Sequence, residues 1–462
     1  MMVRKVWHTP AAISWLQALL AERFGQAFDL QLLPGETRIV LRLPGDTRFI
    51  TLALDGATFS RADSDLPCAQ WNAGAEGWQV ALPGNLPAPG VAQLPAPLII
   101  ATDSGWHIGY DILGLTYWML TRQEEVGRTD LDGHGRFPAA ASHAYKNGYL
   151  HRPIVDEWLL IVAQAIKLAW PALGLKSTEY SLQLTHDVDS PARYGFSNAK
   201  RFIRSVAGDL IVRKSLRAAL RAPSLFFGGR NQLHPSDPLN TFDWIMDRSE
   251  EYGLKSAFYF ICGRTDPLRD ALYDVDDPAI RKLIRRIHNR GHEIGLHPSF
   301  GTFLQPDAIA IEAAALKRVC AEEGVFQSSW GGRMHFLRWK HPETMRAWDD
   351  AGMHYDSTLG YPETPGFRCG TCIEYQAFDP VANVPLRLRI RPLVAMDVSV
   401  IADQYLGLGT SDKACDEFYR VAEACRSVGG TFALLWHNCQ LETSVDRALF
   451  LKVLDSATRT GY

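Results

Sequence analysis

The stretch Ser181-Leu-Gln-Leu-Thr-His-Asp-Val-Asp-Ser190 decides how the rest of the chain is interpreted. Leu182 and Leu184 alternate with polar residues, as in the last part of a buried strand. Because residues two apart on a strand point the same way, we expect Asp187 and Asp189 to project together from its carboxyl end. Two carboxylates this close repel unless a cation or a proton lies between them, which indicates a metal ligand beside a base. A solvated turn is the structural alternative, because Asp and Ser are common turn residues.

Length and composition indicate a globular protein with two domains. At 462 residues the chain is too long for one ordinary core, and we expect domains at 1–178 and 179–462. Hydrophobic residues make up 47% of the chain, and the net charge of −3 gives no general basis for binding nucleic acid. No stretch approaches the roughly 20 apolar residues that a membrane span needs. The N-terminus shows no convincing signal-peptide cleavage site, so we expect a cytoplasmic protein.

Residues 1–178 predict a smaller mixed α/β domain. Short alternating runs at 37–42 and 48–54 are typical of strands, and 83–97, rich in Pro, Gly and Ala, is expected to be a loop. Helices are expected at 7–23, 111–122 and 151–166. This domain carries no catalytic signature, so its function stays open.

From Ser181 onward, predicted strands alternate with predicted helices. The expected strands are 181–186, 255–261, 292–297, 327–333, 353–357, 393–400 and 431–437. The expected helices are 239–252, 278–290, 307–323, 341–351 and 412–427. This alternation predicts an α/β fold, a distorted (β/α) barrel of about seven parallel strands. The chemistry of such barrels lies at the carboxyl ends of the strands.

Side chains that bind metals or transfer protons collect at these strand ends. His297 ends the third expected strand, Arg333 and His335 end the fourth, and His437 ends the last. A single histidine in such a place is more often satisfied by a hydrogen bond than bound to a metal. Several of them at equivalent ends, together with the Asp pair, predict one polar site.

These residues resemble the polysaccharide deacetylases of carbohydrate esterase family 4, whose catalytic part is the NodB-homology domain. The resemblance covers about 181–440, and the chain is similar to an uncharacterised bacterial branch with an extra N-terminal domain. It implies a metal-dependent hydrolase that acts on carbon–nitrogen bonds and removes N-acetyl or O-acetyl groups from a saccharide.

The first two family motifs assign a base and two metal ligands. Thr185-His-Asp-Val-Asp189 is a stretched version of the family's Thr-Phe-Asp-Asp. By this match Asp187 is the base and Asp189 a metal ligand. Gly291-His-Glu-Ile-Gly295 followed by His297 is similar to the family's second motif, which makes His297 a second ligand.

Two further matches complete the implied machinery. Arg333 matches the arginine that orients the base, and Leu435-Trp-His437 matches the closing motif whose histidine protonates the leaving group. A bound divalent ion would lower the pKa of water to about 7 and polarise the carbonyl. Asp187 would then take a proton, and His437 would give one to the departing nitrogen.

One departure from the family concerns the third metal ligand. The family usually has a second metal histidine four residues after the first, but position 301 is Gly. We expect His335, from the neighbouring strand, to supply this ligand beside Asp189 and His297. The cofactor would be a divalent metal, with Zn²⁺ favoured over Co²⁺, Ni²⁺ or Mn²⁺. The alternative is a weakly metallated or metal-free site with two ligands.

The substrate is expected to be a saccharide, either free, polymeric or linked to a carrier such as a cell-surface polysaccharide precursor. We expect Tyr361, Arg368 and Trp436 to line the pocket and bind it. Two other functions stay open, namely hydrolysis of another linear or cyclic amide, as in allantoinase-like relatives, and metal-free saccharide binding without catalysis.

A basic insertion at 191–238 follows the first strand of the second domain. Its part 193–230 has nine Lys and Arg side chains and a single acid, Asp209, with apolar residues at roughly helical spacing. This pattern predicts a basic amphipathic helix that contacts an anionic membrane or an acidic saccharide carrier. A solvated helix pair packed on the first domain is the simpler alternative.

Overall fold

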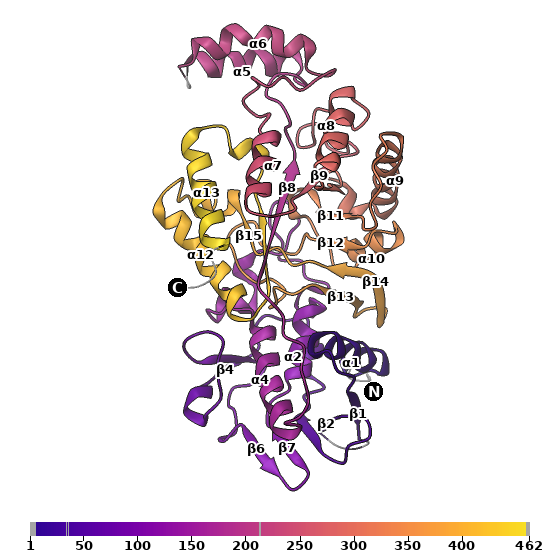
Figure 1. Cartoon of the computed structure of the whole chain (residues 1–462). Coiled ribbons are helices and arrows are strands. Elements are labelled where there is room, and N and C mark those ends of the chain that lie inside the picture. Colours follow the sequence, from indigo (N-terminus) through magenta and orange to yellow (C-terminus); the bar gives the residue numbers. More distant parts are fainter. Residues whose placement is uncertain (1–5, 34, 36, 212–213, 459–462) are drawn as a thin grey trace.

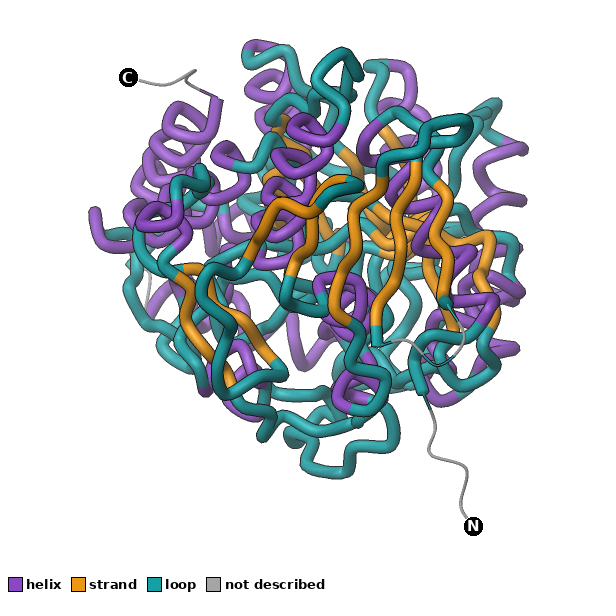
Figure 2. The backbone as a smooth tube through the Cα atoms, turned by 90° about the horizontal axis from the view of Figure 1, so that it is seen from below, coloured by secondary structure: helices purple, strands orange, loops and turns teal. Residues whose placement is uncertain are grey.

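The computed structural model describes residues 6–33, 35, 37–211 and 214–458. Figure 1 shows an N-terminal unit at one end, a large sheet flanked by helices in the middle, and a helical hairpin at the other end. Figure 2, seen from below, shows helices around the strands. Across these ranges, no helix combines the length and the apolar character that crossing a membrane requires.

The N-terminal unit has a five-stranded sheet of order β1-β2-β3-β7-β6 and a separate two-stranded sheet. Its strands are β1 (Asp29–Leu32), β2 (Arg38–Arg42), β3 (Phe49–Ala53), β4 (Cys68–Trp71), β5 (Leu86–Pro89), β6 (Ile99–Thr102) and β7 (Gly105–Ile108). Its helices are α1 (Pro10–Phe24), α2 (Ile112–Leu120), α3 (His143–Lys146) and α4 (Ile154–Ala169). The expectation that 83–97 is only a loop was wrong, because β5 pairs there with β4.

Local sequence signals set the ends of the first helices. The side chain of Thr9 accepts a hydrogen bond from the backbone of Ala12, and Pro10 occupies the first turn of α1, where its missing N–H costs nothing. Gly25, with φ of 69°, ends α1 in the left-handed conformation that Gly adopts readily. Asp111 caps α2 by accepting from the backbone N–H of Gly114 at 2.7 Å.

The second unit is built around a sheet of order β13-β14-β12-β11-β10-β9-β8-β16-β15. Its strands are β8 (Ser181–Val188), β9 (Ala257–Phe260), β10 (Glu293–Leu296), β11 (Gly331–Gly332), β12 (Tyr355–Asp356), β13 (Tyr375–Asp379), β14 (Val384–Ile390), β15 (Ala395–Met396) and β16 (Thr431–Leu435). The described pairings are parallel, except that β13 and β14 form an antiparallel hairpin. The prediction of an α/β fold with a parallel sheet is thereby confirmed.

The strand order is open among the described residues, so the closed barrel stays a prediction. β14 pairs with β12 at Ile390, and β15 pairs with β16 from Ala395. These strands lie toward opposite ends of the sheet, yet only residues 391–394 separate them. Five residue steps span at most roughly 18 Å. The two ends of the sheet therefore curve toward each other.

Helices cover this sheet and continue beyond it. They are α5 (Ala199–Ile211), α6 (Leu216–Gly228), α7 (Phe242–Glu251), α8 (Pro278–Asn289), α9 (Pro306–Glu322), α10 (Glu343–Asp350), α11 (Asp397–Ile401), α12 (Asp412–Ser427) and α13 (Ser444–Thr458). The strand expected at 393–400 was wrong in its second half, because the chain turns into α11 at Asp397.

Glycines allow the short strand β11 to lie close to its neighbours. A Cβ atom on Gly332 would lie 1.8 Å from the carbonyl oxygen of Leu296, and one on Gly331 would lie 2.3 Å from the ring of Tyr355. Any side chain here would push β11 away from β10 and β12. The next residue, Arg333, is thereby held between its neighbouring strands.

The two units share one continuous core. Trp15 of α1 packs against Phe378 of β13, with ring centroids 5.2 Å apart, and its indole N–H donates to the carbonyl of Gln376 at 3.0 Å. Arg368 of the second unit forms a buried ion pair with Glu125 of the first. The N-terminal unit is therefore fixed against the large sheet.

Candidate active site

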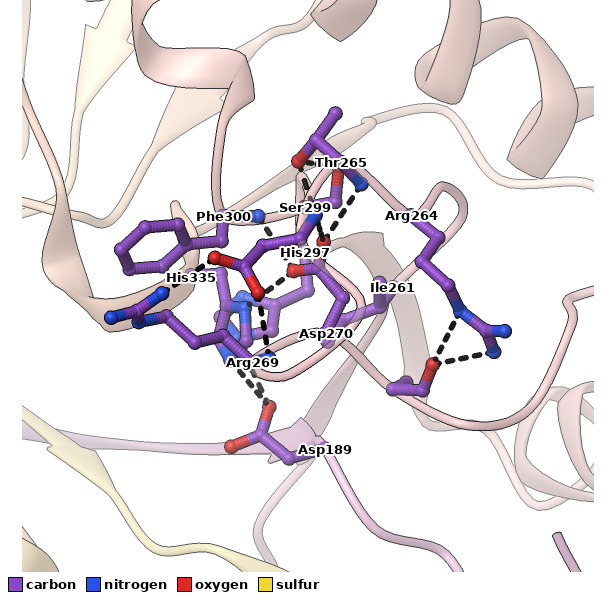
Figure 3. Close-up of polar contacts among 12 residues, drawn as sticks. Asp189, Ile261, Arg264, Thr265, Arg269, Asp270, His297, Ser299, Phe300 and His335 are labelled. Carbon is purple, nitrogen blue, oxygen red and sulfur yellow. Dashed lines mark hydrogen bonds and ion pairs between the residues drawn. The ribbon is translucent and has the colours of Figure 1, made fainter. Parts of the chain in front are cut away.

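Three predicted metal ligands converge at the carboxyl end of the sheet. Asp189 follows β8, His297 follows β10, and His335 follows β11. One ligand atom from each of these three residues, the candidate metal triad, lies within 4.8 Å of the others. The Nε2 atoms of His297 and His335 lie 3.3 and 3.7 Å from Oδ1 of Asp189. Figure 3 shows the carboxylate of Asp189 directed toward the two imidazole rings.

Both histidines of the triad are oriented through their other ring nitrogen. Nδ1 of His297 lies 2.6 Å from the carbonyl oxygen of Arg333, and Nδ1 of His335 lies 3.1 Å from Oδ1 of Asp270. A carbonyl or carboxylate oxygen can only accept, so each Nδ1 carries the proton. In the neutral rings the Nε2 lone pairs then face Asp189. Histidines that bind metals in proteins are held in this way.

The carboxylate of Asp189 fits a cation. Its Oδ1 atom is buried and has no hydrogen-bond partner among the residues that the structure describes. Burial raises the pKa of Asp189, but the positive charge of His335 and the other histidines in their protonated form more than offsets this and keeps it below its ordinary value. When a cation replaces those protons, the carboxylate oxygen and the two Nε2 lone pairs form a set of donors that suits Zn²⁺ and similar divalent ions.

Position 301 leaves little room for the histidine that the motif comparison placed there. The backbone N–H of Gly301 donates to the hydroxyl of Thr265 at 2.6 Å. A Cβ atom on Gly301 would lie 3.0 Å from the side chain of Thr265, which leaves little room for a larger residue. His335 lies where the third ligand is needed instead.

Asp187 forms a buried ion pair beside the triad. Oδ1 of Asp187 accepts from Nη1 of Arg333 at 2.9 Å, and Oδ2 lies 3.7 Å from Nε2 of His297. Arg333 is fully buried and also donates to the backbone and hydroxyl oxygens of Ser357, at 2.9 and 3.0 Å. The guanidinium group thus fixes one oxygen of Asp187 and leaves the other facing the triad.

His437 also lies beside the triad and is paired with a carboxylate. Its Nδ1 donates to Oδ1 of Asp397 at 2.8 Å, and its Nε2 lies 3.7 Å from Oδ2 of Asp189. Burial lowers the pKa of His437, but Asp397 raises it more strongly, and the result is about 10. In this arrangement His437 carries a proton on the nitrogen that faces the site.

One open cavity joins these groups. It has about 590 Å³ of empty space, including the solvent at its mouth. Its polar lining consists of Asp187, Asp189, His297, His335, His437, Arg136 and Gln404. Leu337, Met396 and Leu435 form an apolar part of the wall. The five predicted catalytic and metal-binding residues other than Arg333 therefore face a common space.

The three residues expected to bind substrate do not line this cavity. Arg368 is buried and donates to both carboxylate oxygens of Glu125, at 2.9 and 2.6 Å. Tyr361 is buried beneath the guanidinium of Arg368. Trp436 is fully buried and packs against Phe418. All three side chains are therefore part of the core and not of the cavity wall.

Three functional groups of the cavity region escaped the sequence analysis. Asp270 lies in the loop after β9, with no spacing that links it to His335. Asp397 directly follows β15, and an acid at a strand end is a signal that could have identified it. Arg136 comes from the N-terminal unit, where no motif marked it. The positions of Asp270 and Arg136 in the site depend on contacts between distant segments, which the sequence does not show.

Comparisons with known proteins give limited similarity. Residues 60–171 match a family of unknown function (DUF7033), which covers less than half of the chain. No curated protein matches the sequence. A solved structure of a proposed polysaccharide deacetylase from Mycobacterium smegmatis is 17% identical, with a TM-score of 0.39 over 61% of this chain and 85% of that chain. A crystal structure of Puue allantoinase is 12% identical, with a TM-score of 0.36 over 71% and 90%.

Proposed function

We propose that the protein is a metal-dependent hydrolase that removes an acetyl group from an N-acetylated or O-acetylated saccharide. The observation that carries this proposal is the arrangement around one cavity: Asp187 and His437 both lie within 3.7 Å of a member of the candidate metal triad. Hydrolysis of an unactivated amide needs a polarised carbonyl, an activated water and a protonated leaving nitrogen. The cavity holds a group suited to each of these needs.

Asp189, His297 and His335 would hold the divalent ion. When bound, the ion supplies a Lewis acid that polarises the acetyl carbonyl and acidifies water. Asp187 is buried next to this position, and the hydrogen bond from Arg333 to its Oδ1 orients it. The free oxygen of Asp187 can therefore accept the proton that water loses as its oxygen attacks the carbonyl carbon.

His437 would act as the general acid. Its Nε2 proton passes to the leaving nitrogen as the carbon–nitrogen bond breaks, which releases acetate and a free amine. Asp397 stabilises the protonated ring before this transfer. With a divalent ion held by the triad, the protonated ring of His437 would be less strongly favoured, and its proton would be given up more readily.

The test measures metal content and turnover in the same set of variants. Zinc and cobalt are titrated into metal-stripped protein, and hydrolysis is followed on N-acetyl sugars, O-acetyl sugars and cyclic ureides. We expect one equivalent of metal and turnover on an acetylated sugar. Turnover on ureides alone would assign the site to another amide substrate, and absent metal binding would contradict the proposal.

Single substitutions separate the two roles of the acid pair. Asp187→Asn should retain metal and lose turnover by roughly 10²- to 10⁴-fold, because only the proton acceptor is removed. His335→Ala should lose metal. If Asp187→Asn loses metal equally, the two aspartates share ligation, and if His335→Ala keeps full metal content, His335 is not the third ligand.

A further inference from the structure

A helical hairpin formed by α5 and α6 projects from the rest of the molecule. We call residues 199–211 and 214–228 the basic hairpin. It follows β8 in the chain, and Figure 1 shows it beyond the end toward which β8 points. Its two helices enclose a small core of their own, in which Phe202 of α5 and Phe226 of α6 lie 4.5 Å apart between ring centroids. These internal contacts hold the two helices together, so the side chains on the outside of the hairpin are not needed for its shape.

Large apolar side chains cover the outer face of the basic hairpin. On α6, Leu220 and Phe227 follow Leu216 by four and eleven residues, and this spacing places all three on one face of the helix. They are 65%, 74% and 83% exposed. On α5, Ile203 and Leu210 are seven residues apart and are 66% and 47% exposed. Soluble surfaces rarely expose apolar residues in such continuous rows without a partner.

Cations flank these rows, and among the described residues no exposed carboxylate pairs with them. Lys200, Arg204, Lys214 and Arg221 are exposed. The only acid between positions 190 and 236 is Asp209. Asp209 is fully buried, where it accepts from Tyr194 and pairs with Arg193. Arg213 and the side chain of Arg217 lie outside the described residues.

We propose that the basic hairpin is a docking surface for an anionic lipid bilayer. The cations complement lipid phosphate and carboxylate groups, and the leucines and Phe227 can enter the apolar layer just below the headgroups. A projecting hairpin that combines both kinds of side chain on two helices fits a flat fluid surface better than a preformed groove of another protein. This proposal does not depend on the activity proposed for the cavity.

Vesicle flotation of the full-length protein tests the proposal. The vesicles are made of phosphatidylcholine alone or of phosphatidylcholine with phosphatidylserine. We expect at least tenfold more protein to float with the anionic vesicles, and less at 0.5 M salt, where charges are screened. Absence of flotation, or equal flotation with both vesicles at every salt concentration, would overturn the proposal.

Two pairs of substitutions resolve the contributions of the face. Leu220→Ser with Phe227→Ser should lower binding about tenfold or more. Lys200→Gln with Arg204→Gln should lower it about fivefold for each cation removed. Phe326→Ser and Lys413→Gln, at exposed positions elsewhere, are matched controls and should bind as the wild type does.

The same variants detect a different occupant of the face. Light scattering over a range of protein concentrations reports whether two copies associate through it. A dimer that Phe227→Ser abolishes, without vesicle binding by the wild type, would overturn the proposal in favour of self-association. Unchanged vesicle binding by both pairs of variants would also overturn it, because another surface would then carry the binding.

Discussion

The guanidinium of Arg136 donates to the carbonyl oxygen of Phe336 at 2.9 Å, one residue after His335. Arg136 belongs to the N-terminal unit, and Asp132 holds it from the other side at 2.7 Å. Phe336 and Leu337 both have positive φ values, 60° and 54°, which cost roughly 1 to 2 kcal/mol each in residues other than Gly. A contact between the two units therefore supports a strained loop that positions a predicted metal ligand.

We predict that Arg136→Ala weakens metal binding about tenfold or more. Without the hydrogen bond, the strained backbone at Phe336 can relax, and His335 moves with it. The affinity is measured by titrating cobalt into metal-stripped protein and following its absorption. Arg48→Ala is the control. It removes an arginine that forms an exposed ion pair with Asp46, and it should leave the metal affinity unchanged. Equal affinities for Arg136→Ala and the wild type would show that the loop holds its shape alone.

Asp270 supports His335 by accepting a hydrogen bond from Nδ1 of its ring. It accepts hydrogen bonds from the backbone of Phe300 at 2.7 Å and from Thr265 at 2.8 Å, and so has a fixed orientation toward His335. Groups that orient metal-binding histidines typically contribute 10- to 100-fold in affinity. We predict a loss in this range for Asp270→Asn in the same cobalt titration. Asp266→Asn, in the same loop, is the control, and a similar loss there would indicate general disruption of the loop.

The sequence indicated which residues meet at the candidate site better than it indicated which residues surround them. Asp187, Asp189 and His297 lie at strand ends that alternation and motif spacing mark clearly, and the parallel sheet brings such ends together. His335 could be proposed because β11 neighbours β10. Arg368 could not be assigned correctly, because its partner Glu125 lies 243 residues away. A buried arginine beside an aromatic ring has the same local pattern whether it binds a substrate or joins two domains.

The fold also departs from the prediction where local patterns compete. The apolar run after residue 393 suggested one strand, but the side chain of Asp397 accepts from the backbone of Val398 and of His437, and a helix begins there. This turn places Asp397 beside His437 and so creates part of the candidate site. Contacts across distant segments override the periodicity of a short run.

The ion pair between Glu125 and Arg368 should hold the two units together. Glu125 also accepts from Arg122 at 2.9 Å, and all three side chains are buried. Removing one partner of a buried ion pair leaves an uncompensated charge and typically costs 3–5 kcal/mol. We predict a loss of about this size for Glu125→Ala, measured by urea unfolding. Glu417→Ala breaks an ion pair near the surface and should cost less than about 1 kcal/mol. A similar small effect for Glu125→Ala would contradict the role of the pair.

His186, next to Asp187, should make the protein sensitive to acid. Its Nδ1 donates to the carbonyl of Trp436 at 2.6 Å, and in the described part of the chain its buried Nε2 finds no partner. Burial lowers the pKa of His186 from 6.5 to about 3. Between these values the unfolded chain binds a proton that the folded protein does not bind. Stability contributed by the neutral ring is therefore present above pH 6.5 and falls as the pH decreases toward 3.

The variant His186→Asn isolates this effect, because the amide can still donate to Trp436 but does not titrate. The free energy of unfolding is measured in urea at pH 7 and pH 5 for the wild type and the variant. We predict that the wild type loses about 2 kcal/mol more than the variant over this interval, from the linkage of about 1.4 kcal/mol per pH unit below 6.5. His288→Asn, on the half-buried side of α8, should lose as much as the wild type. If His186→Asn loses as much as the wild type, His186 takes up its proton in the folded state at an ordinary pH, and another buried group causes the acid sensitivity.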